Sequence, residues 1–79
     1  MKARVTVTLK PSVLDPQGKA IEGALHELAV PGIKGVRQGK VFDIELADMA
    51  PDAATAALKA AAEKLLANLI VETYHIELV

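Results

Sequence analysis

The clearest pattern lies near the start of the chain, where apolar and polar side chains alternate. In "RVTVTLK", residues 4–10, Val5, Val7 and Leu9 share one parity and polar residues occupy the other. A period of two places successive side chains on opposite faces of an extended chain, as in a half-buried β-strand. We therefore predict a strand here that ends at Pro11, because proline cannot continue a central ladder.

The next stretch, "LDPQGKAIEGAL" at residues 14–25, carries the signals of a helix start. Asp15 can cap the free N–H groups of a first turn, and Pro16 suits the opening position. Apolar residues then recur at helical spacing, in a stripe made of Ile21, Ala24, Leu25 and Leu28. We expect the helix to end at "VPG", residues 30–32. Gly18 and Gly23 weaken it, since each costs roughly 0.8–1 kcal/mol relative to alanine.

A second, alanine-rich helix is predicted over "PDAATAALKAAAEKLLAN", residues 51–68. Proline and aspartate suit its first turn, and Asn68 suits a left-handed residue at its end. Its apolar stripe is Ala54, Leu58, Ala61 and Leu65. Because alanine fills little volume, we expect this helix to lie close to whatever it covers.

The last segment, "LIVETYHIELV" at residues 69–79, predicts a closing strand. Its apolar parity consists of Ile70, Tyr74, Ile76 and Leu78, and Glu72 shares that parity. A buried glutamate is rare unless it is paired. Glu72 either reaches solvent near the strand end or pairs with Arg37 or Lys40 across strands or subunits.

The middle segment, "VRQGKVFDIEL" at residues 36–46, permits two interpretations. A hairpin that turns at Gln38 and Gly39 is the ordinary one, but a type I′ turn prefers Asn or Asp before the glycine. The apolar residues keep even parity throughout, which favours one bent strand with Gly39 as a bulge. Such a strand is long for so small a globule, so we predict that part of it pairs with another protomer.

Length and composition exclude several classes of protein. The 79 residues predict one domain, 1–79, near the lower limit of independent stability, and a net charge of −1 gives no basic field for nucleic acid or anionic membrane. No apolar run approaches the roughly 20 residues of a membrane span, and the start of the chain lacks the apolar block of a signal peptide. We expect a cytoplasmic chain without nucleic-acid or membrane partners.

Candidate catalytic chemistry is sparse. The chain has no cysteine, which removes thiolate metal sites and cysteine nucleophiles, and neither His26 nor His75 has a partner in sequence. Asp43 and Glu45 share one strand face and are interpreted as solvated. Gly18 and Lys19 at a helix start match no phosphate-binding motif, and Asp15 as cap occupies the donors that an anion needs. We predict no catalytic, metal or cofactor-binding residues.

Three segments in this order resemble the PurS family: "VLDPQG" at 13–18, "VRQGK" at 36–40, and "LLAN" with "VETY" within 65–74. PurS is the small subunit of bacterial and archaeal phosphoribosylformylglycinamidine synthase. The resemblance implies an α+β two-layer sandwich related to ferredoxin-like folds, with an antiparallel sheet and two helices on one face. It also implies a homo-oligomer (dimer or tetramer) that bridges a glutaminase subunit and a large synthase subunit in purine biosynthesis and supports ammonia transfer, while ATP and Mg are used by the synthase.

The residues carried over from the resemblance are expected to be structural or interface residues, not catalytic ones. They are Asp15, Gln17, Gly18, Gly23, Arg37, Gly39, Lys40, Asn68, Glu72 and Tyr74. Gly18 and Gly23 are interpreted as positions where another backbone approaches. The alternative function from another class is a ferredoxin-like regulatory module that senses a small molecule, for which "PSVLDPQG" would be the glycine-bearing loop.

Overall fold

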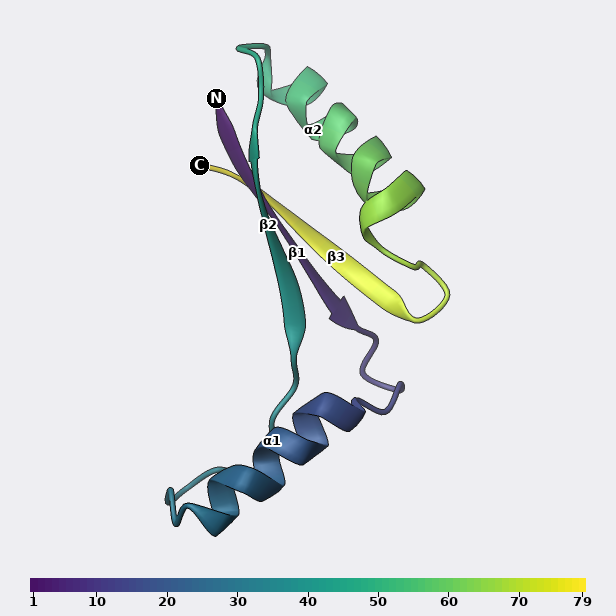
Figure 1. Ribbon diagram of the computed structural model, residues 1–79. Helices are drawn as coiled ribbons and strands as arrows, with labels where there is room; N and C mark the ends of the chain where they lie inside the picture. The colour runs from purple at the N-terminus through teal and green to yellow at the C-terminus, as the bar shows by residue number, and fades with distance from the viewer.

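The computed structural model describes residues 1–79 and has a three-stranded antiparallel sheet in the order β2-β1-β3. Along the chain the elements are β1 (Lys2–Leu9), α1 (Pro16–Glu27), β2 (Gly39–Glu45), α2 (Pro51–Ala61), the π-helical turn η1 (Ala62–Leu66) and β3 (Glu72–Leu78). The predicted α+β class and antiparallel sheet are confirmed (Figure 1). No helix has the length and hydropathy needed to cross a membrane.

The alternation in the first strand defines the two faces of the sheet. Val5 and Val7 are almost completely buried, and Val5 lies between Phe42 of β2 and Ile76 of β3. The opposite parity of the three strands carries mostly polar side chains, among them Arg4, which hydrogen-bonds Asp43. One face of the sheet is therefore apolar and the other is polar, as the period of two predicts.

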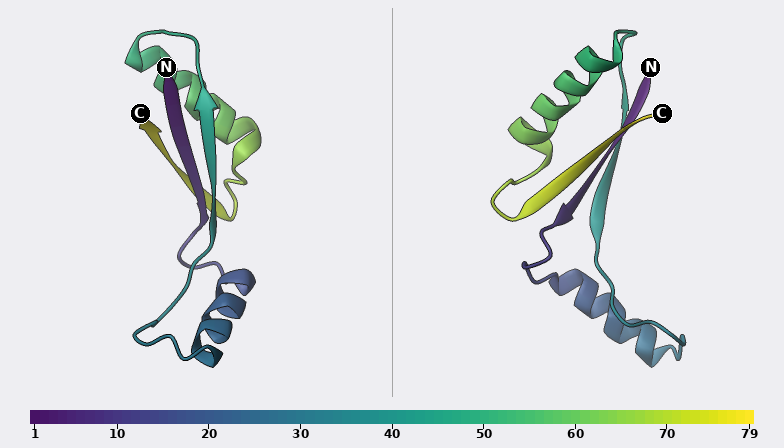
Figure 2. Two further views of the ribbon diagram at one scale, coloured as in Figure 1. Left: turned by 60° about the vertical axis from the view of Figure 1, so that its left-hand side comes forward. Right: turned by 180° about the vertical axis from the view of Figure 1, so that it is seen from behind.

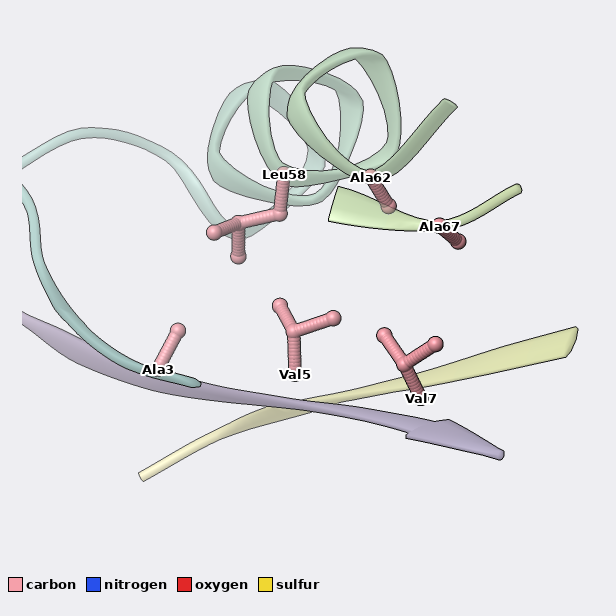
Figure 3. Packing of buried hydrophobic residues seen from close by; sticks show 6 residues of the cluster. All are labelled: Ala3, Val5, Val7, Leu58, Ala62 and Ala67. Carbon is pink, nitrogen blue, oxygen red and sulfur yellow. The ribbon is translucent and has the colours of Figure 1, made fainter. Parts of the chain in front are cut away.

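A single helix covers the apolar face. The side chains of Leu58 in α2, Ala62 in η1 and Ala67 just after η1 point down onto the strand that carries Val5 and Val7 (Figure 3). The small alanine side chains allow the close approach that the sequence predicts. The resulting core is thin, since only nine residues of the chain are buried.

The expected pair of helices on one sheet face is wrong, because α1 lies beyond the end of the strands (Figures 1 and 2). The segments 10–15 and 28–38 carry it away from the sheet, whose apolar face is already covered by α2. The chain is accordingly elongated, with extents of 48 × 25 × 15 Å. Its radius of gyration is 15.8 Å, against about 12 Å for a compact chain of this length. We call residues 16–30 the α1 arm.

The apolar stripe of the α1 arm is largely open in this chain. Ile21 is 39% exposed and Leu28 is 72% exposed. The helix also ends earlier than the predicted "VPG" stop, because Ala29 takes a left-handed conformation with φ of 58°. The N–H of Val30 then reaches back to the carbonyl of Leu25 at 3.1 Å, which closes the helix end.

The end of the second helix also departs from its predicted register. A π-helical turn shifts the inward positions to Ala62 and Leu66, so Leu65 is 83% exposed and Ala61 is only half-buried. The predicted left-handed cap at Asn68 is wrong as well, since Ala29 is the one non-glycine residue with positive φ. Asn68 instead closes a turn, in which its carbonyl accepts the N–H groups of Val71 and Glu72.

The middle segment forms one strand, so the hairpin is wrong. β2 pairs with β1 without interruption from Thr8↔Gly39 to Lys2↔Glu45. The strand is shorter than the predicted residues 36–46, and Gly39 begins it instead of forming a bulge. Residues 33–38 are not in a strand, because they lead from α1 to the sheet. The part of the molecule that extends beyond the sheet is the α1 arm, not a continuation of β2.

Candidate functional site

A polar hollow lies where the start of α1 meets the ends of the strands. It measures about 160 Å³ and is lined by Val7, Leu9, Asp15, Gln17, Gln38, Gly39, Lys40 and Glu72. Five of these lining residues belong to the set predicted from the sequence as structural or interface residues: Asp15, Gln17, Gly39, Lys40 and Glu72. Segments far apart in the chain therefore bring half of the predicted residues to one place.

Asp15 holds the centre of this junction. The residue is 4% exposed. Its Oδ1 accepts the Gly18 N–H at 2.9 Å, and its Oδ2 accepts the Gln38 N–H at 2.6 Å. The first bond is the predicted N-cap, and the second joins α1 to the residue that precedes β2. The backbone N–H of Gln38, followed by that of Gly18, lowers the pKa of the Asp15 carboxyl below its usual 3.8.

Arg37 closes the other side of the same junction. One guanidinium nitrogen, Nη2, donates to the carbonyl oxygens of Lys10 at 3.0 Å and Val13 at 2.9 Å. The two segments that connect α1 to the sheet are thus bound to each other. Gln38 adds a further link, because its side-chain amide donates to Oε1 of Gln17 at 2.7 Å.

The glycines of this region behave differently from one another. A Cβ on Gly18 would collide with the Val36 carbonyl oxygen and the Asp15 carboxylate, and one on Gly39 would lie 2.7 Å from the Val7 carbonyl oxygen. A close backbone approach is therefore present at Gly18, and it comes from the same chain. Gly23 has open space around its Cβ position, so its role toward another chain stays a prediction.

Glu72 is a half-buried acid that shares the apolar parity of the last strand. Its side chain is 14% exposed, and Oε2 lies 3.6 Å from Nζ of Lys40. Oε1 accepts the N–H of Asn68 at 2.7 Å. Of the two partners considered from the sequence, Lys40 is the one that pairs, since Arg37 is engaged with backbone carbonyls.

Tyr74 lies apart from the hollow and contacts the π-helical turn. Its hydroxyl donates to Oε2 of Glu63 at 2.6 Å. This hydrogen bond, with partial burial and the negative charge of Glu63, raises the pKa of the Tyr74 phenol above 10.0. The contact ties β3 to η1 at the edge of the core.

The remaining polar groups are also placed by the structure. Nε2 of His26 lies 3.1 Å from the Ile33 carbonyl oxygen, and His75 is exposed with Glu77 at 3.9 Å. No three His, Cys, Asp or Glu side chains come together in a way that could hold a metal ion. Several contacts of the hollow join one element to another, namely Asp15 with Gln38, Gln17 with Gln38, and Lys40 with Glu72, and their chemistry is that of a structural junction.

Gln38 is the residue of this junction that sequence reasoning missed. Its contribution to Asp15 is a backbone N–H, which every non-proline residue possesses. The carbonyl partners of Arg37 cannot be predicted from the sequence either, because every residue has a backbone carbonyl. The only usable signal is the position of "RQ" directly before the strand.

Large apolar side chains are exposed at several places outside this junction. Leu14 is 67% exposed, Leu28 is 72% exposed, and Leu65 and Ile70 are each 83% exposed. Apolar groups exposed to this extent are available for contacts with other proteins. The fold and the junction together define a small α+β interaction subunit.

The family model described as PurS, phosphoribosylformylglycinamidine (FGAM) synthase, matches residues 2–79. The chain belongs to the PurS family. It is 47% identical over 75 residues to the phosphoribosylformylglycinamidine synthase subunit PurS of Mycobacterium leprae, covering 95% of this chain and 91% of that protein. The PurS subunit of Bacillus subtilis is 44% identical over 78 residues, covering 96% of this chain and 89% of its relative.

Solved structures agree with this assignment. B. subtilis PurS superposes with a TM-score of 0.79 at 44% identity, covering 96% of this chain and 94% of the other. A chain from the structure of PurLQS from Thermotoga maritima superposes with a TM-score of 0.88 at 34% identity, with coverage of 96% and 93%. The elongated arrangement of the sheet and the α1 arm is thus shared with solved PurS structures.

Proposed function

We propose that this chain is a non-catalytic coupling subunit of phosphoribosylformylglycinamidine synthase in purine biosynthesis. The observation that carries the proposal is the match along almost the whole chain to proteins named as the PurS subunit of that enzyme. The similarity to a chain of PurLQS supports a place within a multisubunit assembly. The matches favour this function over the small-molecule-sensing module.

The chemistry of the reaction divides the work between chains. A glutaminase releases ammonia from glutamine through a nucleophilic thiol, and this chain has no cysteine, so the thiol belongs to another subunit. The ammonia must reach an activated formylglycinamide ribonucleotide without escaping into water. In this proposal the chain holds a glutaminase subunit and a large synthase subunit in register. ATP and Mg bind to the synthase subunit, not to this chain.

The shape of the chain suits such a connecting role. The α1 arm and the end of the sheet that carries the two termini lie at opposite ends of a 48 Å axis, and each exposes a large apolar side chain, Leu28 in the arm and Val79 at the C-terminus. The thin core also favours association, because small domains bury little of their own surface. We propose a homo-oligomer, a dimer or tetramer, that works in the cytoplasm within the synthase complex.

The test compares two nitrogen donors. Glutamine-dependent formation of the amidine is measured with the glutaminase and synthase subunits, with and without this chain, beside the same assay supplied with ammonia. A coupling subunit raises the glutamine-dependent rate and leaves the ammonia-dependent rate nearly unchanged. If the chain changes neither rate, the proposal is wrong, and stabilisation by purine intermediates or amino acids becomes the next measurement.

A further inference from the structure

The α1 arm is attached to the rest of the molecule through very few contacts. It does not pack on the sheet, and α2 covers the apolar sheet face alone (Figures 1 and 2). Two connecting segments, 10–15 and 31–38, join it to β1 and β2. Without further constraint, an arm on two such segments would take many directions.

A set of polar contacts supplies that constraint. We call it the elbow and define it by six residues, Lys10, Val13, Asp15, Gly18, Arg37 and Gln38. Asp15 binds the first turn of α1 with one carboxylate oxygen and the residue before β2 with the other. Arg37 binds two carbonyls of the β1–α1 segment from the α1–β2 segment.

The elbow is closely packed as well as hydrogen-bonded. Asp15 is buried, and Gly18 leaves no room for a Cβ against the Val36 carbonyl. Both connecting segments are therefore held at the same point, next to the sheet end. Two bound segments at one point resist rotation of the α1 arm in a way that one flexible linker does not.

We propose that the elbow is a positioning device, in which Asp15 and Arg37 set the direction of the α1 arm and thereby the register of the subunits that this chain couples. This inference rests on the proposed function. Neither residue contacts a reacting group, so both act through the direction of the arm. Small misplacements far from the chemistry are known to reduce rates strongly.

The variant Asp15→Asn tests the elbow contact to Gln38 without removing the helix cap. Asparagine caps a helix as well as aspartate does, so its oxygen can still accept the Gly18 N–H. Its amide nitrogen then faces the Gln38 N–H, and two donors cannot bond each other. The variant keeps the helix and loses the link to β2.

The second variant, Arg37→Ala, removes the hydrogen bonds to the carbonyls of Lys10 and Val13. These carbonyls are exposed, so water can satisfy them. The exposed Asp52→Asn, in the first turn of α2, is the matched control.

The direction of the arm can be measured directly, because the chain has no native cysteine. Spin labels at Glu27→Cys and Thr55→Cys, both exposed, report the distance between α1 and α2. Labelled chain diluted with unlabelled chain restricts the signal to pairs within one molecule. We expect a narrow distribution for the parent and Asp52→Asn, and a clearly broader one for Asp15→Asn and Arg37→Ala, with unchanged helix content by circular dichroism. Equal widths in all four proteins would overturn the proposal.

The assembled synthase supplies the second readout. We expect Asp15→Asn and Arg37→Ala, without labels, to lower the glutamine-dependent rate about 10-fold or more while the ammonia-dependent rate changes less than twofold. A broadened arm with an undiminished glutamine-dependent rate overturns the positioning role. If the unmutated chain does not raise the glutamine-dependent rate, the proposed function fails instead, and the coupling part of this proposal falls with it. The unmutated chain thus distinguishes the two failures.

Discussion

The ammonium of Lys40 lies 3.6 Å from the carboxylate of Glu72, and this pair connects β2 to β3 across the strand between them. Neither residue neighbours the other in the sheet, since Lys40 is opposite Val7 and Glu72 is opposite Leu9. The pair lies on the face that α2 covers and closes the core at the end nearest the α1 arm.

We expect this pair to contribute modestly to stability. Lys40 is 60% exposed at its side chain, so a double-mutant cycle with Lys40→Met and Glu72→Gln should give a coupling energy of about 0.5–1 kcal/mol. The Gln side chain keeps an oxygen that can accept the Asn68 N–H, so Glu72→Gln removes the charge and leaves this hydrogen bond in place. Urea unfolding measures the effect, which should shrink with added salt. Lys64→Met is the control, and a coupling near zero contradicts the assignment.

The carboxylate of Asp15 makes stability depend on pH in a defined direction. Its pKa is lowered in the folded chain, so its contribution is fully present above the ordinary value of 3.8 and is lost as pH falls through the folded pKa. The difference in unfolding free energy between the parent and Asp15→Asn should therefore be constant from pH 7 to about pH 5 and narrow at lower pH. A difference that persists unchanged at pH 2 would contradict this linkage.

The two glycines of α1 should respond to alanine with opposite signs. Gly23→Ala meets open space and should stabilise the isolated chain by about 1 kcal/mol. Gly18→Ala meets the Val36 carbonyl and the Asp15 carboxylate, so it should lower the unfolding free energy. Thermal unfolding of the two variants gives the comparison. Stabilisation by both changes would show that the backbone approach at Gly18 is not tight.

Ala29 is the position where glycine should improve the chain. Its φ of 58° lies in the left-handed region, which costs an alanine about 1 kcal/mol relative to a glycine. Ala29→Gly should therefore raise the melting temperature by several degrees. Ala24→Gly, inside the same helix, is the control and should lower it. A lower melting temperature for both variants would contradict the observed helix end.

The π-helical turn predicts unequal effects at two adjacent leucines. Leu65 is 83% exposed, whereas Leu66 packs against the core. Leu66→Ala should lower the unfolding free energy by about 2 kcal/mol, and Leu65→Ala should change it by less than about 0.5 kcal/mol. Chemical unfolding at low protein concentration measures both. The reverse order would restore the α-helical register with Leu65 inside.

The sequence predicts local structure where chain periodicity and caps determine it. The alternation of Val5 and Val7 places β1 and both sheet faces, and Asp15 marks the start of α1. Continuous parity around Phe42 favours one strand over a hairpin. For Glu72, a charged residue on an apolar parity, the sequence leaves three options, which are solvent, Arg37 and Lys40, and the structure shows the pair with Lys40.

The position of α1 and the register at the end of the second helix, which the sequence predicts wrongly, depend on information that periodicity does not contain. The stripe with Ile21 and Leu28 identifies an apolar helix face but not what covers it, so the position of the α1 arm could not be derived. In "AAAEKLLAN", two registers both place apolar residues inward, and Leu65 and Leu66 are equivalent by composition. Tertiary contacts distinguish them, namely the packing of Leu66 against the core and the hydrogen bond of Tyr74 with Glu63.

The position of the α1 arm also has a consequence for how the chain folds. β1 and β2 are neighbours in the sheet, so residues 10–38 form a single connection between two paired strands. The strands and α2 enclose their core without that connection. Closing a longer loop costs little, since the entropy rises only with the logarithm of its length. We therefore expect the arm and the sheet to unfold as separate cooperative units, so that backbone amides of α1 exchange with solvent through local opening and those of β1 exchange only through global unfolding.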